Sequence, residues 1–421
     1  MTTLIKGGHV ICPYNNIDDV LDILVCDERI VKIAKNISDE SDTIIDASGK
    51  YVFPSFCDIH VHLREPGQEY KETIESGCAA AAAGGFGDVC CMPNTNPVAD
   101  NEAVVEYIIN KAKDAPCDVH PIAAITKGLK GEELTEIGKL LKTGAIAFSD
   151  DGKPVVNNRM MRLAMQYSKA FNALIISHCE DKELTDGGVM NEGVRSAAIG
   201  LKGAPWTAEA IMVQREIMLA ELLDTRVHIA HVSCEQSVEL LRQAKKRGIK
   251  VTAETCPHYI YANDSMVNNY DAMTKVNPPL RSEKDRLAII EGLLDGSIDC
   301  IASDHAPHHI DEKLVEYNVA MSGISGIETS FALSYTALVH TGKMPLNELV
   351  RLYTAAPCNI VGINRKGVAE GEFARLTVVD CNCENEISSD TFKSKGKNTP
   401  FNGHKVYAKV VTTIHNGKVI Y

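Results

Sequence analysis

Two histidines separated by a single residue, His60 and His62, end an apolar stretch that has the character of a buried strand. Because the side chains of a strand alternate between its two faces, both imidazoles project to the same side. Such a pair on a rigid element can chelate a metal ion, and Zn²⁺ accepts nitrogen and carboxylate ligands. Taken alone the pair is weak evidence, because two partly buried structural histidines would produce the same pattern.

Further groups that could bind a metal follow other strand-like stretches. They are Asp150 and Asp151, His178, His231, Glu254 with nearby His258, and Asp304 with His305 and His308. One histidine at such a place is usually structural, but four histidines and two carboxylates at equivalent points of several strands indicate a metal site. The potential ligands are nitrogen and oxygen atoms and number more than four, which fits a binuclear site with a bridging carboxylate.

The expected ligands are divided between two ions: His60, His62 and Asp304 for the first, His178 and His231 for the second. Either Asp150 or Asp151 would bridge them, and strand alternation leaves this choice open because the strand end is defined only to within a residue or two. Zinc suits this set best, and manganese or cobalt would also fit. Two such ions lower the pKa of a shared water to about 7, and the hydroxide would attack a carbonyl carbon. Asp304 would act as general base and then as general acid.

Polar side chains near the same strand ends could bind a substrate. Arg64, Asn94 and His308 would surround the mouth of the site, and Arg64 could form charge-assisted hydrogen bonds with a substrate carboxylate. The alternative for Arg64 is a surface salt bridge. The Asp304 loop, residues 302–313, is followed by a long segment without a clear strand and is a candidate lid.

Eight strand-like stretches alternate with helical ones through the middle of the chain. The strands are expected at 51–62, 86–93, 118–125, 144–150, 173–179, 226–232, 250–257 and 299–306, with helices such as 101–113, 235–247 and 283–294 between them. This count is typical of a (β/α)₈ TIM barrel, in which catalytic groups gather at the carboxyl ends of the strands. A doubly wound open sheet is the alternative, but no glycine-rich nucleotide fingerprint follows the first strand.

Both ends of the chain have short alternating runs typical of strands. Residues 1–52 contain four such runs, and 375–380 and 405–414 resemble them. We therefore predict a small flanking β-sandwich built from 1–52 and 366–421, with the barrel at 53–365 inserted between them.

The overall composition excludes several classes of protein. A net charge of −13 argues against nucleic acid or an anionic membrane as the main partner. No run of eighteen apolar residues is present, and residues 1–9 lack the apolar core of a signal peptide. The fourteen cysteines are scattered without a CxxC pair, so we expect neither a disulfide framework nor a thiolate zinc site. A reducing, cytoplasmic compartment is expected.

Seven motifs in order along the chain resemble those of one known family. They are DIHVHLREPG (58–67), MPNT (92–95), SHCED (177–181), HVS (231–233), ETCPH (254–258), VNPPLR (276–281) and ASDHAPHHIDEK (302–313). The chain resembles dihydroorotase of the class I bacterial type, within the amidohydrolase superfamily. The resemblance implies a barrel with a flanking β-sandwich. It also implies a zinc-dependent, reversible cyclisation of N-carbamoyl-L-aspartate to L-dihydroorotate in pyrimidine (UMP) biosynthesis.

The resemblance also assigns roles to individual residues. It implies metal ligation by the four histidines His60, His62, His178 and His231 and by Asp304, with Asp304 as catalytic acid and base. Asp151 looks like the bridging ligand, in place of the carboxylated lysine of other branches. The substrate contacts it implies are Arg64, Asn94, Asn277, His308 and the backbone of Ser322 and Gly323. A homodimer is expected from the family, and an association with aspartate transcarbamoylase is compatible with it. The chain departs from the family pattern at Ser55 and Arg375, both away from the expected site.

Two other functions are considered. A sister cyclic amidohydrolase, such as an allantoinase or a dihydropyrimidinase, would share the metal ligands. Arg64, Asn94 and His308 favour a substrate with a free carboxylate, and a dihydropyrimidinase-like enzyme would be expected to carry a lysine near residue 150. A non-catalytic scaffold for aspartate transcarbamoylase or for self-assembly is disfavoured, because inactive members should have lost ligands.

Overall fold

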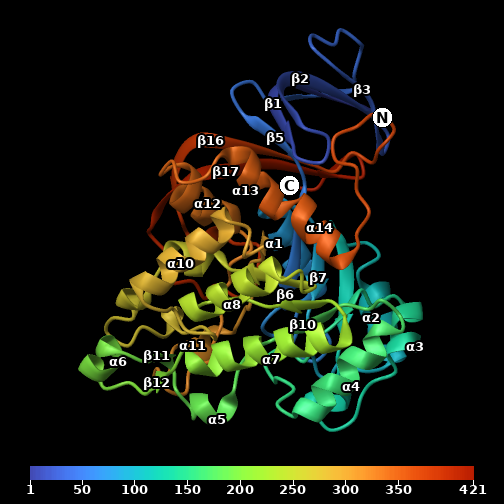
Figure 1. Cartoon of the computed structure of the whole chain (residues 1–421). Coiled ribbons are helices and arrows are strands. Elements are labelled where there is room, and N and C mark those ends of the chain that lie inside the picture. Colours follow the sequence, from blue (N-terminus) through green and yellow to red (C-terminus); the bar gives the residue numbers. More distant parts are fainter.

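Eight parallel strands at the centre of the molecule form the predicted barrel. The computed structural model describes residues 1–421, and Figure 1 shows the barrel strands in the middle with helices outside them. The strands are β6 (Phe56–Val61), β7 (Phe86–Cys91), β8 (Asp118–Ala123), β9 (Ala147–Phe148), β10 (Ile175–Ser177), β13 (Val227–Ile229), β14 (Val251–Thr255) and β15 (Cys300–Ile301). They pair in this order. A parallel bridge between Val61 and His305 joins the first strand to the segment after the last, so the sheet closes on itself.

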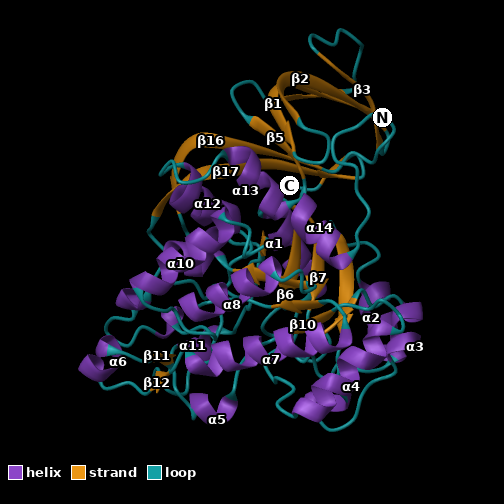
Figure 2. Ribbon diagram, viewed as in Figure 1, coloured by secondary structure: helices purple, strands orange, loops and turns teal.

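Helices cover the outside of the barrel, as Figure 2 shows. The helices of the whole chain are α1 (Ile74–Ala83), α2 (Glu102–Lys111), α3 (Ile137–Thr143), α4 (Asn158–Lys169), α5 (Lys182–Thr185), α6 (Val194–Ile199), α7 (Thr207–Leu223), α8 (Glu235–Lys246), α9 (Pro257–Tyr261), α10 (Glu283–Leu294), α11 (Ile310–Lys313), α12 (Ser330–Ser334), α13 (Leu346–Tyr353) and α14 (Ala355–Val361), of which the short α5 and α6 lie at the loop end, away from the barrel strands. Local sequence fixes several starts: Thr73 caps α1 and Ser282 caps α10, each with a reciprocal capping box. Every residue of β6 and β7 is buried, because helices cover the outer face of a parallel barrel while side chains fill the inside. No helix is both long enough and apolar enough to span a bilayer.

The first expected strand, 51–62, is two strands that belong to different sheets. Residues 51–54 form β5 (Tyr51–Pro54), which pairs with β1 (Thr2–Cys12) and β16 (Leu376–Glu386) of the flanking sheet. After Ser55 the chain enters β6 of the barrel. The continuous apolar character of the stretch misled the sequence prediction, since residues on both sides of the crossing are buried.

The two ends of the chain meet in one flanking, largely antiparallel sheet. Besides β1, β5 and β16 it contains β2 (Ile17–Cys26), β3 (Arg29–Ala34), β4 (Thr43–Asp46), β17 (Lys405–His415) and β18 (Lys418–Val419). Strand β5 lies between the N-terminal and C-terminal strands, with Phe53 opposite Thr377 and Val52 opposite Val378. The sheet has an apolar core of its own, which includes Ile23 and Leu376. The division of the chain into 1–52 with 366–421 and 53–365 stays our proposal.

Partly buried charges link the flanking sheet to the base of the barrel. Asp118, the first residue of β8, contacts Arg375 just before β16 (Nη1–Oδ2, 2.7 Å) and His415 at the end of β17 (Nε2–Oδ1, 3.2 Å). Burial raises the pKa of Asp118, but the hydrogen bond and charge of His415, together with Arg375, outweigh it and hold this pKa at about 2. The unusual Arg375 thus takes part in the contact between the two sheets.

We expect Asp118→Asn to lower stability at neutral pH and to matter less in acid. The pKa of Asp118 is about 2 in the fold against an ordinary value of 3.8, so its stabilisation is complete above about pH 4 and is lost as pH falls towards 2. Because the carboxylate is 38% exposed, the loss at pH 7 should be about 1 kcal/mol. Thermal unfolding at pH 7 and pH 3 measures the loss of stability, with Asp114→Asn at an exposed position as control. A stability difference between wild type and Asp118→Asn that is larger at pH 3 than at pH 7 would contradict the prediction.

Candidate active site

A pocket of about 340 Å³ opens at the carboxyl ends of the barrel strands. It is lined by His62, Arg64, Asn94, Asp151, Gly152, His178, His231, Val276, Asn277, Asp304, Ala306, His308, Ala320, Met321, Ser322 and Gly323. The residues to which the family resemblance gives a role are all among them except His60, whereas the other strand-end candidates, Asp150, Glu254, His258 and His305, are not. His60 is fully buried beneath the pocket floor, against Asp151 and Asp304.

One group of possible metal ligands is formed by His60, His62 and Asp151. The Nε2 atom of His60 lies 3.4 Å from Asp151 Oδ1, and that of His62 lies 3.5 Å from Asp151 Oδ2. Asp304 adjoins the group, since its Oδ1 lies 3.2 Å from His62 Nε2 and 3.5 Å from His60 Nε2. The HxH pair therefore projects to one side, as strand alternation predicts.

A second group is formed by His178, His231 and the same Asp151. His178 Nδ1 and His231 Nε2 are 2.7 Å apart, and they lie 3.6 and 3.8 Å from Asp151 Oδ1. The two groups come from opposite parts of the barrel and share a single carboxylate. Asp151 could therefore contact an ion held by either group of histidines.

The structure distinguishes the two neighbouring aspartates. Asp150 points away from the histidines: its Oδ1 accepts hydrogen bonds from the backbone N–H groups of Ile125 (2.8 Å) and Thr126 (3.0 Å), and the Thr126 hydroxyl donates to Oδ2. Burial raises the pKa of Asp150 to about 6, although these hydrogen bonds lower it. Asp151 is the carboxylate at the centre of the cluster, and Asp150 anchors the loop beside it.

The donor atoms of the cluster suit a cation. His60 Nε2 is buried and has no hydrogen-bond partner, and it faces two carboxylates. Burial lowers the pKa of His60, but the charges of Glu254, Asp304 and Asp151 raise it well above its ordinary value. A metal ion can take the place of the proton that these carboxylates attract to His60. The imidazole and carboxylate set fits zinc.

Two glutamates support the histidines from behind. Glu254 Oε1 lies 2.6 Å from His60 Nδ1, and Glu180 Oε2 lies 3.0 Å from His178 Nε2. Such carboxylates fix the orientation and tautomer of a ligating imidazole. Glu254 stood among the candidate strand-end groups without a role, and Glu180 was not singled out. The signal for Glu180 was its place two residues after His178.

Three residues of the site have strained backbones. Arg64, His231 and Asp304 adopt positive φ angles of 62°, 33° and 45°. Non-glycine residues rarely occupy this region, and each instance costs of the order of 1–3 kcal/mol. Strain of this kind concentrates where side chains must be aimed at a ligand, and here it coincides with the carboxyl ends of three strands.

The polar wall of the pocket faces the cluster. Arg64 is 8% exposed, and its guanidinium donates to the Pro307 carbonyl (3.2 Å) beside His308. Burial and the charges of Arg64 and Lys71 lower the pKa of His308 to about 2, so its imidazole is neutral and donates to the Ser322 carbonyl (2.9 Å). Arg64 is thus the cation in this wall that is available to an anionic ligand.

Two amides complete the predicted substrate contacts. Asn94 bonds His62 Nδ1 through Oδ1 (2.9 Å) and donates to Asp151 (3.3 Å), so it lies against the cluster. Asn277 donates to Glu180 (3.1 Å) at the opposite side of the pocket. The segment 302–313 borders the mouth, and its role as a lid stays a prediction.

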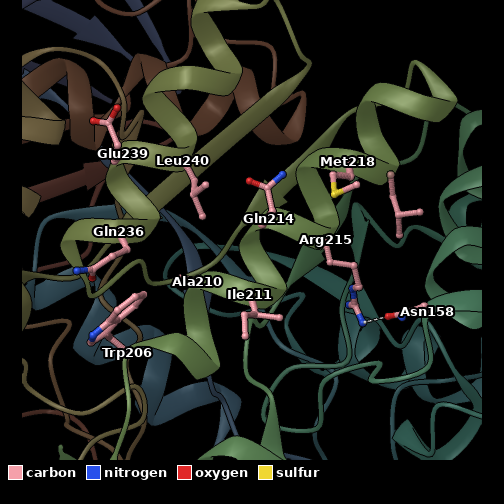
Figure 3. Close-up of a pocket in the computed structure, with 11 residues that line it drawn as sticks. Asn158, Trp206, Ala210, Ile211, Gln214, Arg215, Met218, Gln236, Glu239 and Leu240 are labelled. Atoms are coloured by element: carbon pink, nitrogen blue, oxygen red, sulfur yellow. Dashed lines mark hydrogen bonds between the residues drawn. The ribbon is translucent and has the colours of Figure 1, made fainter.

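A larger cavity than this pocket lies elsewhere on the molecule. It is a groove of about 790 Å³ on the outer surface, formed mainly by α7 and α8, and Figure 3 shows its lining residues. Its walls are mostly apolar, with Trp206, Ile211, Met218 and Leu240 among them, and it contains none of the histidines or aspartates of the cluster. The groove therefore has no part in the chemistry of the site.

Comparison with known proteins assigns the chain to a family. A family model described as Dihydro-orotase-like matches residues 49–237. The dihydroorotase of Acetivibrio thermocellus is 53% identical over 418 residues, which cover 99% of this chain and 98% of the relative. That of Citrifermentans bemidjiense is 49% identical over 423 residues and all of both chains. The chain belongs to the dihydroorotase family.

Solved structures of other amidohydrolases have the same fold as this dihydroorotase-family chain. The L-hydantoinase (dihydropyrimidinase) of Arthrobacter aurescens is similar with a TM-score of 0.88 and 26% identity, covering 99% of this chain and 95% of its own. The dihydropyrimidinase of Brevibacillus agri has a TM-score of 0.87 at 22% identity, covering 100% and 95%. The predicted barrel with a flanking sheet from both chain ends is confirmed.

Paired substitutions at the two aspartates should separate their roles. We expect Asp151→Asn to weaken metal binding more than tenfold, because it alters the carboxylate that both groups of histidines share. The matched control Asp150→Asn should keep wild-type metal content, since Asp150 bonds only the Ile125–Thr126 segment. Metal content after equilibrium dialysis against zinc measures both. Equal losses in the two variants would contradict the assignment.

Proposed function

We propose that this chain is a dihydroorotase, which reversibly cyclises N-carbamoyl-L-aspartate to L-dihydroorotate in pyrimidine biosynthesis. The observation that carries the proposal is the placement of a buried arginine, Arg64, in the same pocket as the two histidine groups around Asp151. A cyclic amide with a free carboxylate needs both features: a centre that activates water and a cation that binds the carboxylate. Family membership agrees with this substrate.

Two zinc ions per chain form part of the proposal. His60, His62 and Asp304 would hold the first ion, His178 and His231 the second, and Asp151 would bridge them. Ions held there supply Lewis acidity, which polarises a carbonyl and lowers the pKa of water to about 7. Glu254 and Glu180 keep the histidines in the orientation and tautomer for ligation.

The remaining steps fall to side chains of the chain itself. In the hydrolytic direction, the oxygen of water forms a bond with the ring carbonyl carbon, and the bond from that carbon to the ring nitrogen breaks. Asp304 Oδ accepts the proton of water and returns it to the leaving nitrogen. Arg64 binds the carboxylate outside the ring with charge-assisted hydrogen bonds, while Asn277 and the backbone at Ser322 and Gly323 bind the ring edges.

A hydantoin or dihydropyrimidine hydrolase is the second candidate, because the similar solved structures carry those names. Their rings lack a free carboxylate. The closeness of Arg64 and His308 in the wall of this pocket (Nη2–Nε2, 3.3 Å) supports a substrate that has one. An aspartate, Asp151, also occupies the position where a lysine would be expected. A scaffold without activity is disfavoured because two groups of histidines share Asp151, and the possible ligand atoms of each group lie within 4.8 Å of one another.

Turnover of a panel of cyclic amides tests the proposal. Purified protein supplied with zinc should hydrolyse L-dihydroorotate and leave allantoin, dihydrouracil and hydantoin unchanged, and a chelator should remove the activity reversibly. Asp304→Asn should lower kcat by about 10²- to 10⁴-fold, because general acid–base catalysis contributes that much.

The outcomes of the panel are distinct. Turnover of dihydrouracil or hydantoin without L-dihydroorotate would support the second candidate. No turnover of any compound, even after addition of aspartate transcarbamoylase, would support the scaffold. The addition of aspartate transcarbamoylase also tests whether that enzyme associates with this chain. If the two proteins associate, they should co-migrate in gel filtration.

We also propose a homodimer in the cytoplasm, formed through the groove of Figure 3. On the outer face of α7, Ile211, Met218 and Leu222 are 52%, 59% and 65% exposed at a spacing of seven and four residues. They form one apolar stripe that a second copy of α7 would cover around a two-fold axis, where the same patch serves both subunits. The fourteen free thiols, twelve of them buried, suit a reducing compartment.

A charge placed in this stripe should separate the subunits. We expect Met218→Glu to weaken dimerisation more than tenfold, because the two-fold axis would bring two like charges together in an apolar contact. Sedimentation at micromolar concentration measures it, with Lys418→Glu on the distant strand β18 as control. A wild-type chain that sediments as a monomer would contradict the proposal.

A further inference from the structure

A side chain from the C-terminal part of the chain reaches the mouth of the active-site pocket. Asn398 belongs to the segment between β16 and β17, outside the barrel, and is 2% exposed. The same segment is bound to the barrel mouth at Ser394, whose hydroxyl donates to buried Glu72. No motif that predicted the site includes this segment.

The carboxamide of Asn398 is fully hydrogen-bonded to the pocket wall. Its Nδ2 donates to the carbonyls of Ala306 (3.0 Å) and Gly323 (2.9 Å). Its Oδ1 accepts from the backbone N–H of His308 (2.8 Å) and the hydroxyl of Ser325 (2.8 Å). Two carbonyls on one side and an N–H on the other fix the orientation of the amide.

Gly323 is also held from its other side. The buried ammonium of Lys313 donates to the carbonyls of Gly323 (3.1 Å), Met321 (2.9 Å) and Lys275 (3.2 Å). Lys313 and Asn398 therefore share one acceptor and fix the segment 321–323 between them. Through the Lys275 carbonyl, Lys313 also links the segment 321–323 to the segment that carries Asn277.

The backbone at Gly323 lies close to Ala306 and His308 across the pocket wall. Gly323 has a φ of 148°, and a Cβ there would come within 2.7 Å of the Ala306 Cβ and carbonyl oxygen and 3.0 Å of His308 Nε2. The segments of Gly323 and His308 are thus in close contact across the pocket wall. Neither segment is a helix or strand at that point. The backbone joins them through a bridge between His305 and Ile324, where the Ala306 N–H donates to the Ile324 carbonyl (2.9 Å), and the side-chain hydrogen bonds add to this short pairing.

We propose that Asn398 is a positioning residue for the substrate-binding wall and acts through His308 and Gly323. This inference rests on the proposed function, because it takes the wall to be the place where the dihydroorotate ring and carboxylate bind. The four side-chain hydrogen bonds of Asn398 all go to the wall and none goes to the cluster around Asp151, so its loss should affect substrate binding and leave metal binding intact.

Two substitutions at Asn398 test the proposal. Asn398→Asp keeps the size of the side chain but loses both donors and places a charge against two carbonyls, and Asn398→Ala removes all four hydrogen bonds. We expect KM for L-dihydroorotate to rise about 10- to 100-fold, the effect of losing one or two hydrogen bonds that position a ligand site. Values of kcat should stay within about threefold, and bound metal should stay at the wild-type level.

Matched controls separate positioning from general damage. Asn402→Ala removes an exposed amide of the same segment that accepts from the Ser389 N–H, and it should leave KM unchanged. Lys313→Met keeps the buried aliphatic part of the side chain without its donors, and it should raise KM as Asn398→Ala does. If the Asn398 variants do not fold, this variant tests whether hydrogen bonds to Gly323 position the wall. An unchanged KM, or a parallel loss of kcat and metal, would overturn the proposal.

A second measurement does not depend on activity. Amide hydrogen exchange should rise at 306–308 and 321–325 in Asn398→Ala, with no change in the peptide that carries His60 and His62. If wild-type protein fails to turn over L-dihydroorotate, the proposed function fails, and unchanged exchange at these segments would overturn the inference separately.

Discussion

The carboxylate of Asp151 is the group on which the site depends. Four imidazoles approach it, from His60, His62, His178 and His231, at 3.4, 3.5, 3.6 and 3.8 Å. A buried carboxylate among so many potential cations is stable only if charges and hydrogen bonds are closely matched. The barrel provides this match, because parallel strands end at one edge and bring residues from distant parts of the sequence to a common point. Glu254 and Glu180 complete the charge balance behind the histidines.

The pocket has two walls of different construction. The wall formed by the histidines and aspartates around Asp151 lies at the strand ends, where backbone hydrogen bonds between neighbouring strands fix each residue. The closed sheet also supports the strained backbones of Asp304 and His231. The opposite wall is made of loops and is fixed by a few backbone hydrogen bonds together with side-chain hydrogen bonds from Asn398 and Lys313. This division lets the loop wall change with the ligand while the other wall stays constant, which suits a fold shared with hydantoinases.

Much of the fold and of the candidate site could be predicted from the sequence. Each barrel strand lies within or close to an expected stretch, because apolar runs between helical segments mark parallel strands covered on both sides. Histidines and aspartates at strand ends were identifiable because residue type and position together point to metal chemistry. The passage of the chain at Ser55 from the flanking sheet to the barrel could not be predicted, because the residues on both sides of it are buried. From strand alternation alone, the choice between Asp150 and Asp151 depended on one residue of register. The resemblance favoured Asp151, which in the structure lies among the histidines, while Asp150 bonds Thr126. Asn398 lies in a polar segment with no periodicity, and its role arises from long-range contacts alone.

The late position of Asn398 in the chain has a consequence for the order in which the molecule is made. During synthesis from the N-terminus, the last of the histidines and aspartates around the cluster emerges with Asp304, while the residue that fixes the opposite wall emerges near the end of the chain. Strands β17 and β18, which complete the flanking sheet, follow later still. A nascent chain therefore holds the side chains for an ion well before it has a shaped pocket for a small molecule, and chains released early would lack that pocket.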